Sequence, residues 1–273
     1  MTRGLINWLL VAIAIFIMVG CGEQTKEVRL VFKFPSEKVY HYMYDSKSST
    51  VVTENDKQTL TGEKSNRITY TQEVVKNIDN TTARLLFSYS QTDEETKTEK
   101  NWSTTCIMAT DGNITEFKPD SNISDETFEY YRQLFEQTSP VYPHEPVPEG
   151  YSWTNRYTVL LDKGKTEAST TYKIKAFARE AGYDCAVIEY KGTMIIPLGS
   201  NPMGDGSVKI SGADHIDVEG VSYFSYTTGI LVRQEETTHL VREGTQQKEN
   251  KSITFRIEEN RNNLTRLVDI TNK

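Results

Sequence analysis

The residues with the clearest potential for chemistry are the acidic stretch Asp214-His215-Ile216-Asp217-Val218-Glu219. Asp205 precedes it in a glycine-rich segment, so carboxylate oxygens at alternating positions could converge on Ca²⁺. Period two explains the stretch without a metal, because Ile216 and Val218 would point inward while the charged residues between them would face water. We therefore expect a solvated strand face here, with no metal ion and no other cofactor.

Short motifs that mark common enzymes are missing from the chain. It contains no Gly-x-Ser-x-Gly elbow, no His-Glu-x-x-His helix, no phosphate-binding loop and no dinucleotide fingerprint. The four histidines include no pair at i and i+4. We therefore expect a protein that is not an enzyme. The alternative is an envelope hydrolase that uses carboxylates of the 205–219 region, such as Asp214 and Asp217.

Two further residue groups could shape a site. Tyr40, Tyr42 and Tyr44 alternate along one predicted strand and would share a face, so they could line a ligand groove. The alternative is a stripe at the edge of the core with its hydroxyls in water. Cys106 and Cys185 lie in different halves of the chain, and a bond between them would close about 80 residues and stabilise by about 4 kcal/mol. Two buried free thiols are the alternative, since sequence does not fix their Cα separation.

The N-terminus carries the pattern of an export signal that ends at a cysteine. Arg3 precedes an unbroken apolar run from Trp8 to Val19, which as a helix rises only about 18 Å, short of the roughly 30 Å hydrocarbon core of a membrane. The run ends in Met18-Val19-Gly20-Cys21. This sequence resembles the lipobox of bacterial lipoproteins, in which the cysteine thiol receives diacylglycerol and the signal peptide is cleaved before it. A plain anchor helix with a chance cysteine is the alternative.

The lipobox resemblance implies a layout and a location. Residues 1–20 would be the signal peptide, and 21–27 would be the lipidated Cys21 and a polar tether. The mature chain would then be held on the extracytoplasmic face of a cell membrane by a diacylglyceryl cysteine that also carries palmitate. Gly22 is not the Asp that retains lipoproteins in the inner membrane of Gram-negative cells, so an outer membrane is open as a destination.

Charge excludes one class of partner. The chain has 273 residues with 31 Lys+Arg against 38 Asp+Glu, a net charge of −7. Such a chain offers no basic surface for phosphate backbones, so we expect no nucleic-acid binding. The partners that stay open are the membrane, a lipid and a protein outside the cytoplasm.

Hydrophobic periodicity predicts a mainly antiparallel β fold. Short runs with period two, such as 67–75 and 83–89, are separated by turn residues and form a predicted hairpin. The order of hairpin, strand and glycine turn occurs twice, which predicts a single domain over 28–270 made of two similar β-meander halves, 28–120 and 151–270. The alternative is that this internal similarity is what any β-rich chain would show, since β patterning is permissive. The halves would form a curved sheet, an open barrel or a sandwich.

One helix is predicted between the halves, over 124–138, because Ser124 can cap it and Pro140 stops it. The proline-rich connector 139–150 then reads as a stiff spacer. The predicted core consists of Ile68, Tyr70, Leu85, Phe87, Ile107, Phe128, Leu134, Phe135, Trp153, Tyr157, Val187, Ile195, Phe224, Ile230, Val232, Phe255 and Ile257.

The mature region also resembles a family. Pro146-Val147-Pro148-Glu149-Gly150-Tyr151-Ser152-Trp153, followed by strands and a late Gly229-Ile230-Leu231, resembles exported bacterial lipoproteins that share a domain of unknown function. The resemblance implies an anchored β-rich module and brings no catalytic residues. It suits a non-enzymatic lipoprotein that binds an apolar ligand, an envelope component or a partner protein. Lipid-carrier lipoproteins combine a sheet and a helix in this way, which is an analogy of architecture alone.

Overall fold

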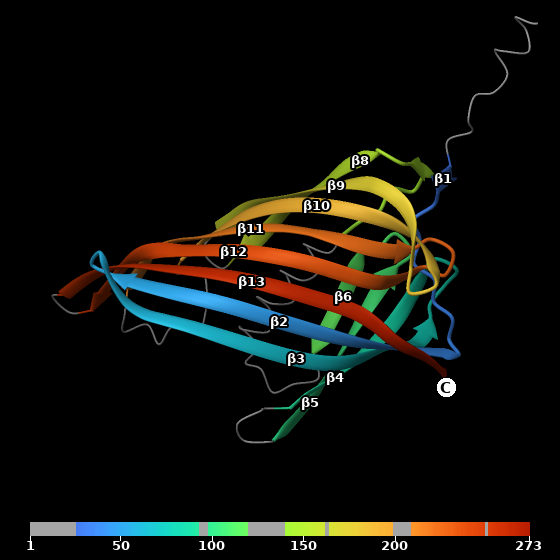
Figure 1. Cartoon of the computed structure of the whole chain (residues 1–273), viewed down its shortest axis with the longest axis horizontal. Coiled ribbons are helices and arrows are strands. Elements are labelled where there is room, and N and C mark those ends of the chain that lie inside the picture. Colours follow the sequence, from blue (N-terminus) through green and yellow to red (C-terminus); the bar gives the residue numbers. More distant parts are fainter. Residues whose placement is uncertain (1–25, 93–97, 120–139, 162–163, 199–208, 249–250) are drawn as a thin grey trace, which may run out of the picture.

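The structure is a computed structural model that describes residues 26–92, 98–119, 140–161, 164–198, 209–248 and 251–273. Most of them belong to one antiparallel sheet of 11 strands (Figure 1). Its strands are β2 (Lys38–Glu54), β3 (Lys57–Asn77), β4 (Thr82–Thr92), β5 (Glu99–Ala109), β6 (Ile114–Pro119), β8 (Ser152–Leu161), β9 (Gly164–Glu180), β10 (Tyr183–Pro197), β11 (Lys209–Ser225), β12 (Ile230–Lys248) and β13 (Lys251–Asn272). The prediction of a mainly antiparallel β fold is confirmed.

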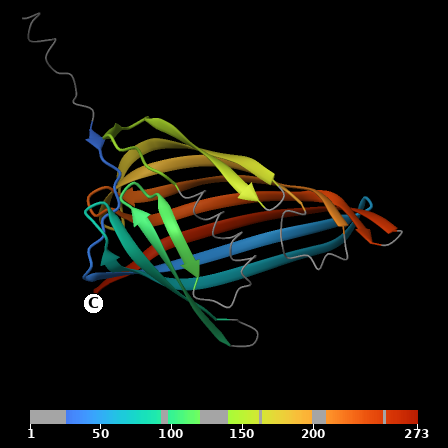
Figure 2. The same cartoon turned by 180° about the vertical axis from the view of Figure 1, so that it is seen from behind.

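The sheet consists of two meanders joined side by side. Strands β2 to β6 form the first and β8 to β13 form the second, and β13 pairs with β2, so the strand order is β6-β5-β4-β3-β2-β13-β12-β11-β10-β9-β8. Seen from behind, the green strands at one end and the yellow-green β8 at the other lie in front of the central strands (Figure 2). In the described part of the chain no ladder joins β6 to β8. The chain therefore forms a curved sheet that is not closed.

Tight turns fix the register of the long hairpins. Asn55 and Asp56 connect β2 to β3 with φ of 44° and 63°, and Ala181 and Gly182 connect β9 to β10 with φ of 47° and 88°. Two residues with positive φ give the turn whose twist matches that of the flanking strands. Asn, Asp and Gly tolerate this conformation better than other residues, so Asn55, Asp56 and Gly182 favour these turns, while Ala181 adopts it without such a preference.

Alternation along each strand decides which side chains enter the core. In β9, for example, Tyr172 and Ile174 are buried while Lys173 between them is exposed. The predicted core positions Leu85, Val187, Phe224, Ile230 and Val232 are buried, as expected. The prediction for Ile195 is wrong, because its side chain is 46% exposed while that of its neighbour Ile196 is buried.

The connector between the meanders packs against the fold. Its Val147–Pro148 forms β7, which pairs with β1 (Glu27–Val28) in a separate two-stranded sheet. Tyr142 is buried, and the carbonyl of Val141 accepts a hydrogen bond from the Trp153 indole at 3.1 Å. The connector is therefore anchored by its side chains and is more than a spacer. The predicted helix 124–138 lies outside the described residues, as do residues 1–20 and Cys21.

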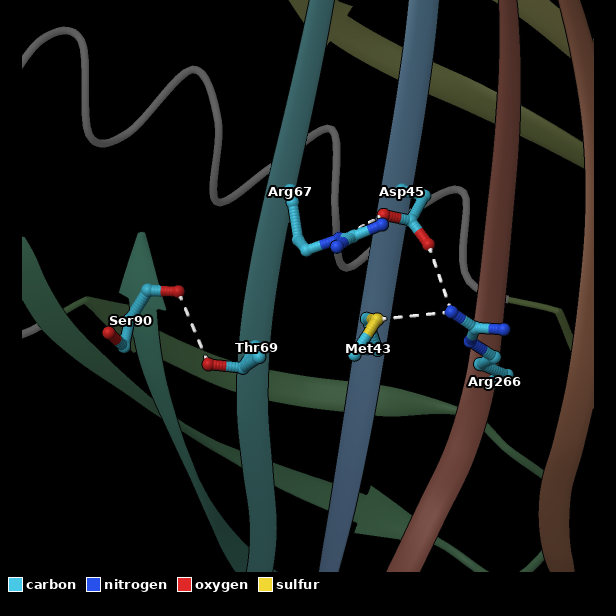
Figure 3. A network of polar contacts seen from close by, with 6 residues as sticks. All are labelled: Met43, Asp45, Arg67, Thr69, Ser90 and Arg266. Atoms are coloured by element: carbon cyan, nitrogen blue, oxygen red, sulfur yellow. Dashed lines mark hydrogen bonds and ion pairs between the residues drawn. The ribbon is translucent and has the colours of Figure 1, made fainter. Parts of the chain in front are cut away.

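The seam between the meanders carries a surface ion network (Figure 3). Asp45 on β2 accepts a hydrogen bond from Arg67 of β3 at 2.6 Å and pairs with Arg266 of β13 at 3.5 Å. Arg266 also lies 3.2 Å from the sulfur of Met43. Arg67 is 65% exposed, and pairs exposed to this degree contribute about 0–1 kcal/mol. The backbone ladder between β2 and β13 therefore holds the seam.

Candidate functional site: an apolar cavity inside the curved sheet

A cavity of about 580 Å³ lies between the two meanders. Its wall includes Tyr42 and Tyr70 of the first meander and Tyr172 and Tyr190 of the second. These strands are far apart in the sheet order, so their side chains can border one cavity only on the concave side of the curve. Phe32 and the connector residue Tyr142 also line it. The cavity is therefore built by the curvature of the whole sheet.

The first meander contributes a row of stacked rings, which we call the first aromatic row. It runs across neighbouring strands through Tyr42, Tyr70, Tyr89 and Trp102, each directly opposite the next. Ring centroids lie 5.0, 5.5 and 5.2 Å apart along it. Cross-strand aromatic pairs stabilise a sheet and keep their rings in fixed orientations. Tyr42 and Tyr70 of this row line the cavity, so the stacked rings give that side of it a rigid apolar wall.

The second meander contributes an equivalent row, the second aromatic row, of Trp153, Tyr172 and Tyr190. Its ring centroids lie 5.1 and 5.9 Å apart. The row ends at Gly220, opposite Tyr190, where an added Cβ would lie 2.5 Å from the Cζ and Oη atoms of that ring. A glycine is needed here because the tyrosine ring lies directly over its backbone.

Burial makes the tyrosines of the cavity harder to ionise. Loss of hydration raises the pKa of Tyr42, Tyr70, Tyr172 and Tyr190 well above that of a free tyrosine. The Tyr42 hydroxyl donates a hydrogen bond to the Leu231 carbonyl at 3.0 Å. These phenols therefore act as hydrogen-bond donors and apolar surface, and they carry no charge at neutral pH.

One end of the cavity is polar. Tyr190 and Glu236 border both the cavity and a larger groove of about 1460 Å³. Charged residues such as Lys64, Lys191 and Glu219 line that groove. An occupant of the cavity would thus have apolar surroundings for its body and a polar exit beside Glu236.

The three tyrosines predicted to share a groove differ in their surroundings, although Tyr40 and Tyr42 pack in one buried cluster. Tyr42 lines the cavity, while Tyr40 is buried in a cluster with Cys185 and Ile230. The Tyr44 hydroxyl donates to the Asn263 side chain at 2.8 Å. Tyr42 alone of the three thus borders the cavity among the described residues.

The carboxylates of the acidic stretch lie on different faces of β11. Asp214 is buried and accepts two hydrogen bonds from Arg242, at 2.7 and 2.8 Å. Asp217 is exposed, because residues three apart in a strand point to opposite sides. The described residues hold no cluster of three groups able to bind a metal, and Asp205 lies outside them. The strand therefore does not bring Asp214 and Asp217 together.

In the structure Cys106 and Cys185 are both buried, and no disulfide joins them. Cys106 packs in a cluster with Leu85 and Met108, and Cys185 packs in a different cluster with Val232. Burial raises the pKa of Cys185 to about 11. Of the two alternatives, the structure has the unbridged one.

Sequence reasoning missed most of the cavity wall. Tyr70 and Tyr89 are opposite each other in one hairpin, as are Tyr172 and Tyr190 in the other. These tyrosines also occupy matching positions in the internal comparison of the two halves, so that comparison held a signal for them. That the halves arose by duplication stays a prediction. Glu236 gave no signal, since its place depends on the register of β12.

No family model matches the chain, and no curated protein matches it. In the part of the chain that the structure describes, there is no helix long and apolar enough to cross a membrane.

Proposed function

We propose that this chain is a membrane-anchored, extracytoplasmic lipoprotein that is not an enzyme and that binds a small apolar molecule inside its curved sheet. The cavity between the aromatic rows is the observation that carries this proposal. Its volume of about 580 Å³ falls within the range of about 300–1,000 Å³ that small-molecule sites occupy.

The chemistry of the wall supports binding by apolar contact. Rings and aliphatic side chains such as Met108, Ile114 and Ile216 make up much of it. Each methylene buried there contributes about 0.8 kcal/mol, against an association cost of 4 kcal/mol or more. A ligand with only a few carbons would therefore gain too little, and we expect an alkyl chain or fused rings.

The wall also favours binding over catalysis. No histidine or cysteine is among the described residues that line the cavity, and Glu236 is the only carboxylate among them. A catalytic pair drawn from these residue types needs two such groups within hydrogen-bond reach, and the hydroxyl that Glu236 contacts, that of Tyr190, is made harder to ionise by burial. The lining supplies one, which suits a carrier or a sensor.

The anchor is tested by metabolic labelling. Cells that express the full chain are fed radiolabelled palmitate, and we expect label in the wild type and none in Cys21→Ser. An unlabelled wild-type chain that retains residues 1–20 would contradict the anchor.

The ligand is tested by native mass spectrometry. The full chain is purified from membranes in mild detergent without delipidation, and we expect one apolar adduct per chain that is lost on unfolding. A chain that carries no adduct and takes up no apolar probe would contradict the proposal.

A further inference from the structure

We propose that the ligand is a cationic amphiphile, with an alkyl body in the apolar cavity and an ammonium head beside Glu236. This inference rests on the proposed function and adds the charge class of the ligand. Glu236 is the only charged side chain among the described residues that line the cavity.

Glu236 is fully hydrogen-bonded and yet has no countercharge. Its Oε2 accepts from the Tyr190 hydroxyl at 3.0 Å and from Gln234 at 3.4 Å. Its Oε1 accepts from Asn263 at 3.1 Å and from Thr238 at 3.5 Å. All four donors are neutral, and no ion pair between described residues includes Glu236. The site thus holds a fixed negative charge that the protein orients but does not neutralise.

Two neighbouring carboxylates, unlike Glu236, are each paired with an arginine. Glu235, which directly precedes Glu236 on β12, is exposed and pairs with Arg233. Asp214, buried on β11, is held by two hydrogen bonds from Arg242. The wall of an apolar cavity weakens solvent screening, so a lone carboxylate there attracts a cation more strongly than one in water.

The position of Glu236 suits a head group. It borders both the apolar cavity and the polar groove, so a cation beside it would keep part of its hydration in the groove. The rings of Tyr172 and Tyr190 line the cavity, so the alkyl body of the same ligand would lie against them. An anionic head would be repelled by Glu236, and among the described residues that line the cavity no cation offsets this repulsion.

Isothermal titration calorimetry on the full chain tests this with three ten-carbon probes below their micelle concentrations. The probes are decylammonium, 1-decanol and decanoate, and the variants are Glu236→Gln and its strand neighbour Glu235→Gln as the matched control. We expect wild type and Glu235→Gln to bind decylammonium about tenfold or more tighter than 1-decanol. In Glu236→Gln that preference should vanish while 1-decanol binds as before. Melting curves establish that each variant folds.

The other outcomes separate the two proposals. If all chains bind 1-decanol and decylammonium equally, or bind decanoate best, the charge assignment is wrong and the apolar cavity stands. If no probe binds any folded chain, the proposed function fails together with the inference.

Discussion

Replacing Gly220 with alanine should damage the second aromatic row. The new Cβ would lie 2.4 Å from the Glu235 carbonyl oxygen and 2.5 Å from the Tyr190 ring, where ordinary contacts are 3.4 Å or longer. The backbone oxygen cannot move alone, so the ring and the strand must separate. Overpacking of this kind costs about 1–3 kcal/mol, and removing a strand glycine returns about 0.5–1 kcal/mol. We expect a net loss of about 1–2 kcal/mol.

Gly62 on β3 provides the matched control, because nothing lies within 4 Å of a Cβ added there. Gly62→Ala should therefore stabilise the fold by about 0.5 kcal/mol. In thermal unfolding followed by circular dichroism, Gly220→Ala should lower Tm by about 2–8 °C while Gly62→Ala raises it slightly. Equal shifts for the two variants would show that the Tyr190 ring does not pack on Gly220.

Burial and pairing lead to four more predictions. Trp153→Ala should lower the free energy of unfolding in urea by about 2–4 kcal/mol, because the indole stacks on Tyr172 and donates a hydrogen bond to the Val141 carbonyl. A urea midpoint equal to that of the wild type would argue against this packing. Asp214→Ala should lower the free energy of unfolding by about 1–3 kcal/mol, because it leaves the partly buried Arg242 without its bidentate partner. Asp45→Ala removes a more exposed pair and should cost less than about 1 kcal/mol, and the reverse order in urea unfolding would contradict the burial argument. The folded-state pKa of Cys185, about 11, lies above its ordinary 9.0, so its contribution to stability is present below pH 9 and is lost as pH rises through about 11. Because both thiols are buried, Cys106 and Cys185 should not react with maleimide at pH 7 in the native chain without reductant. Both should react once urea unfolds the chain, and failure of the two to react in urea would indicate a disulfide between them.

The hairpins were predictable from sequence because each is encoded locally. The runs 67–75 and 83–89 alternate for the most part and lie on β3 and β4, which pair as predicted. Positive-φ turns such as Ala181-Gly182 mark where the chain reverses. Period and turn residues thus suffice for strands that are consecutive in the chain.

The joining of the two meanders into one sheet could not be predicted in the same way. It depends on β13 pairing with β2, the last strand with the first of the large sheet, and this contact joins residues more than 200 positions apart. Curved sheets and sandwiches bury the same alternating pattern, so composition does not choose between them. The choice is made by twist accumulated over many strands.

The cavity wall could not be predicted from sequence for the same reason, because it depends on contacts between strands that are far apart in the chain. Tyr42 was singled out because its own strand shows the alternation. Glu236 is one of many acidic residues until the registers of β11, β12 and β13 place it beside Tyr190 and Asn263.

Blocking the cavity tests the central claim most directly. Ala168 is buried on β9 and lines the cavity, so Ala168→Phe would fill part of it, while Ala178→Phe on the same strand adds a ring at an exposed site. Titration with the neutral dye N-phenylnaphthylamine should give saturable fluorescence for wild type and Ala178→Phe, with at least tenfold weaker binding for Ala168→Phe. Equal binding by all three folded chains would place the apolar ligand elsewhere and contradict the account.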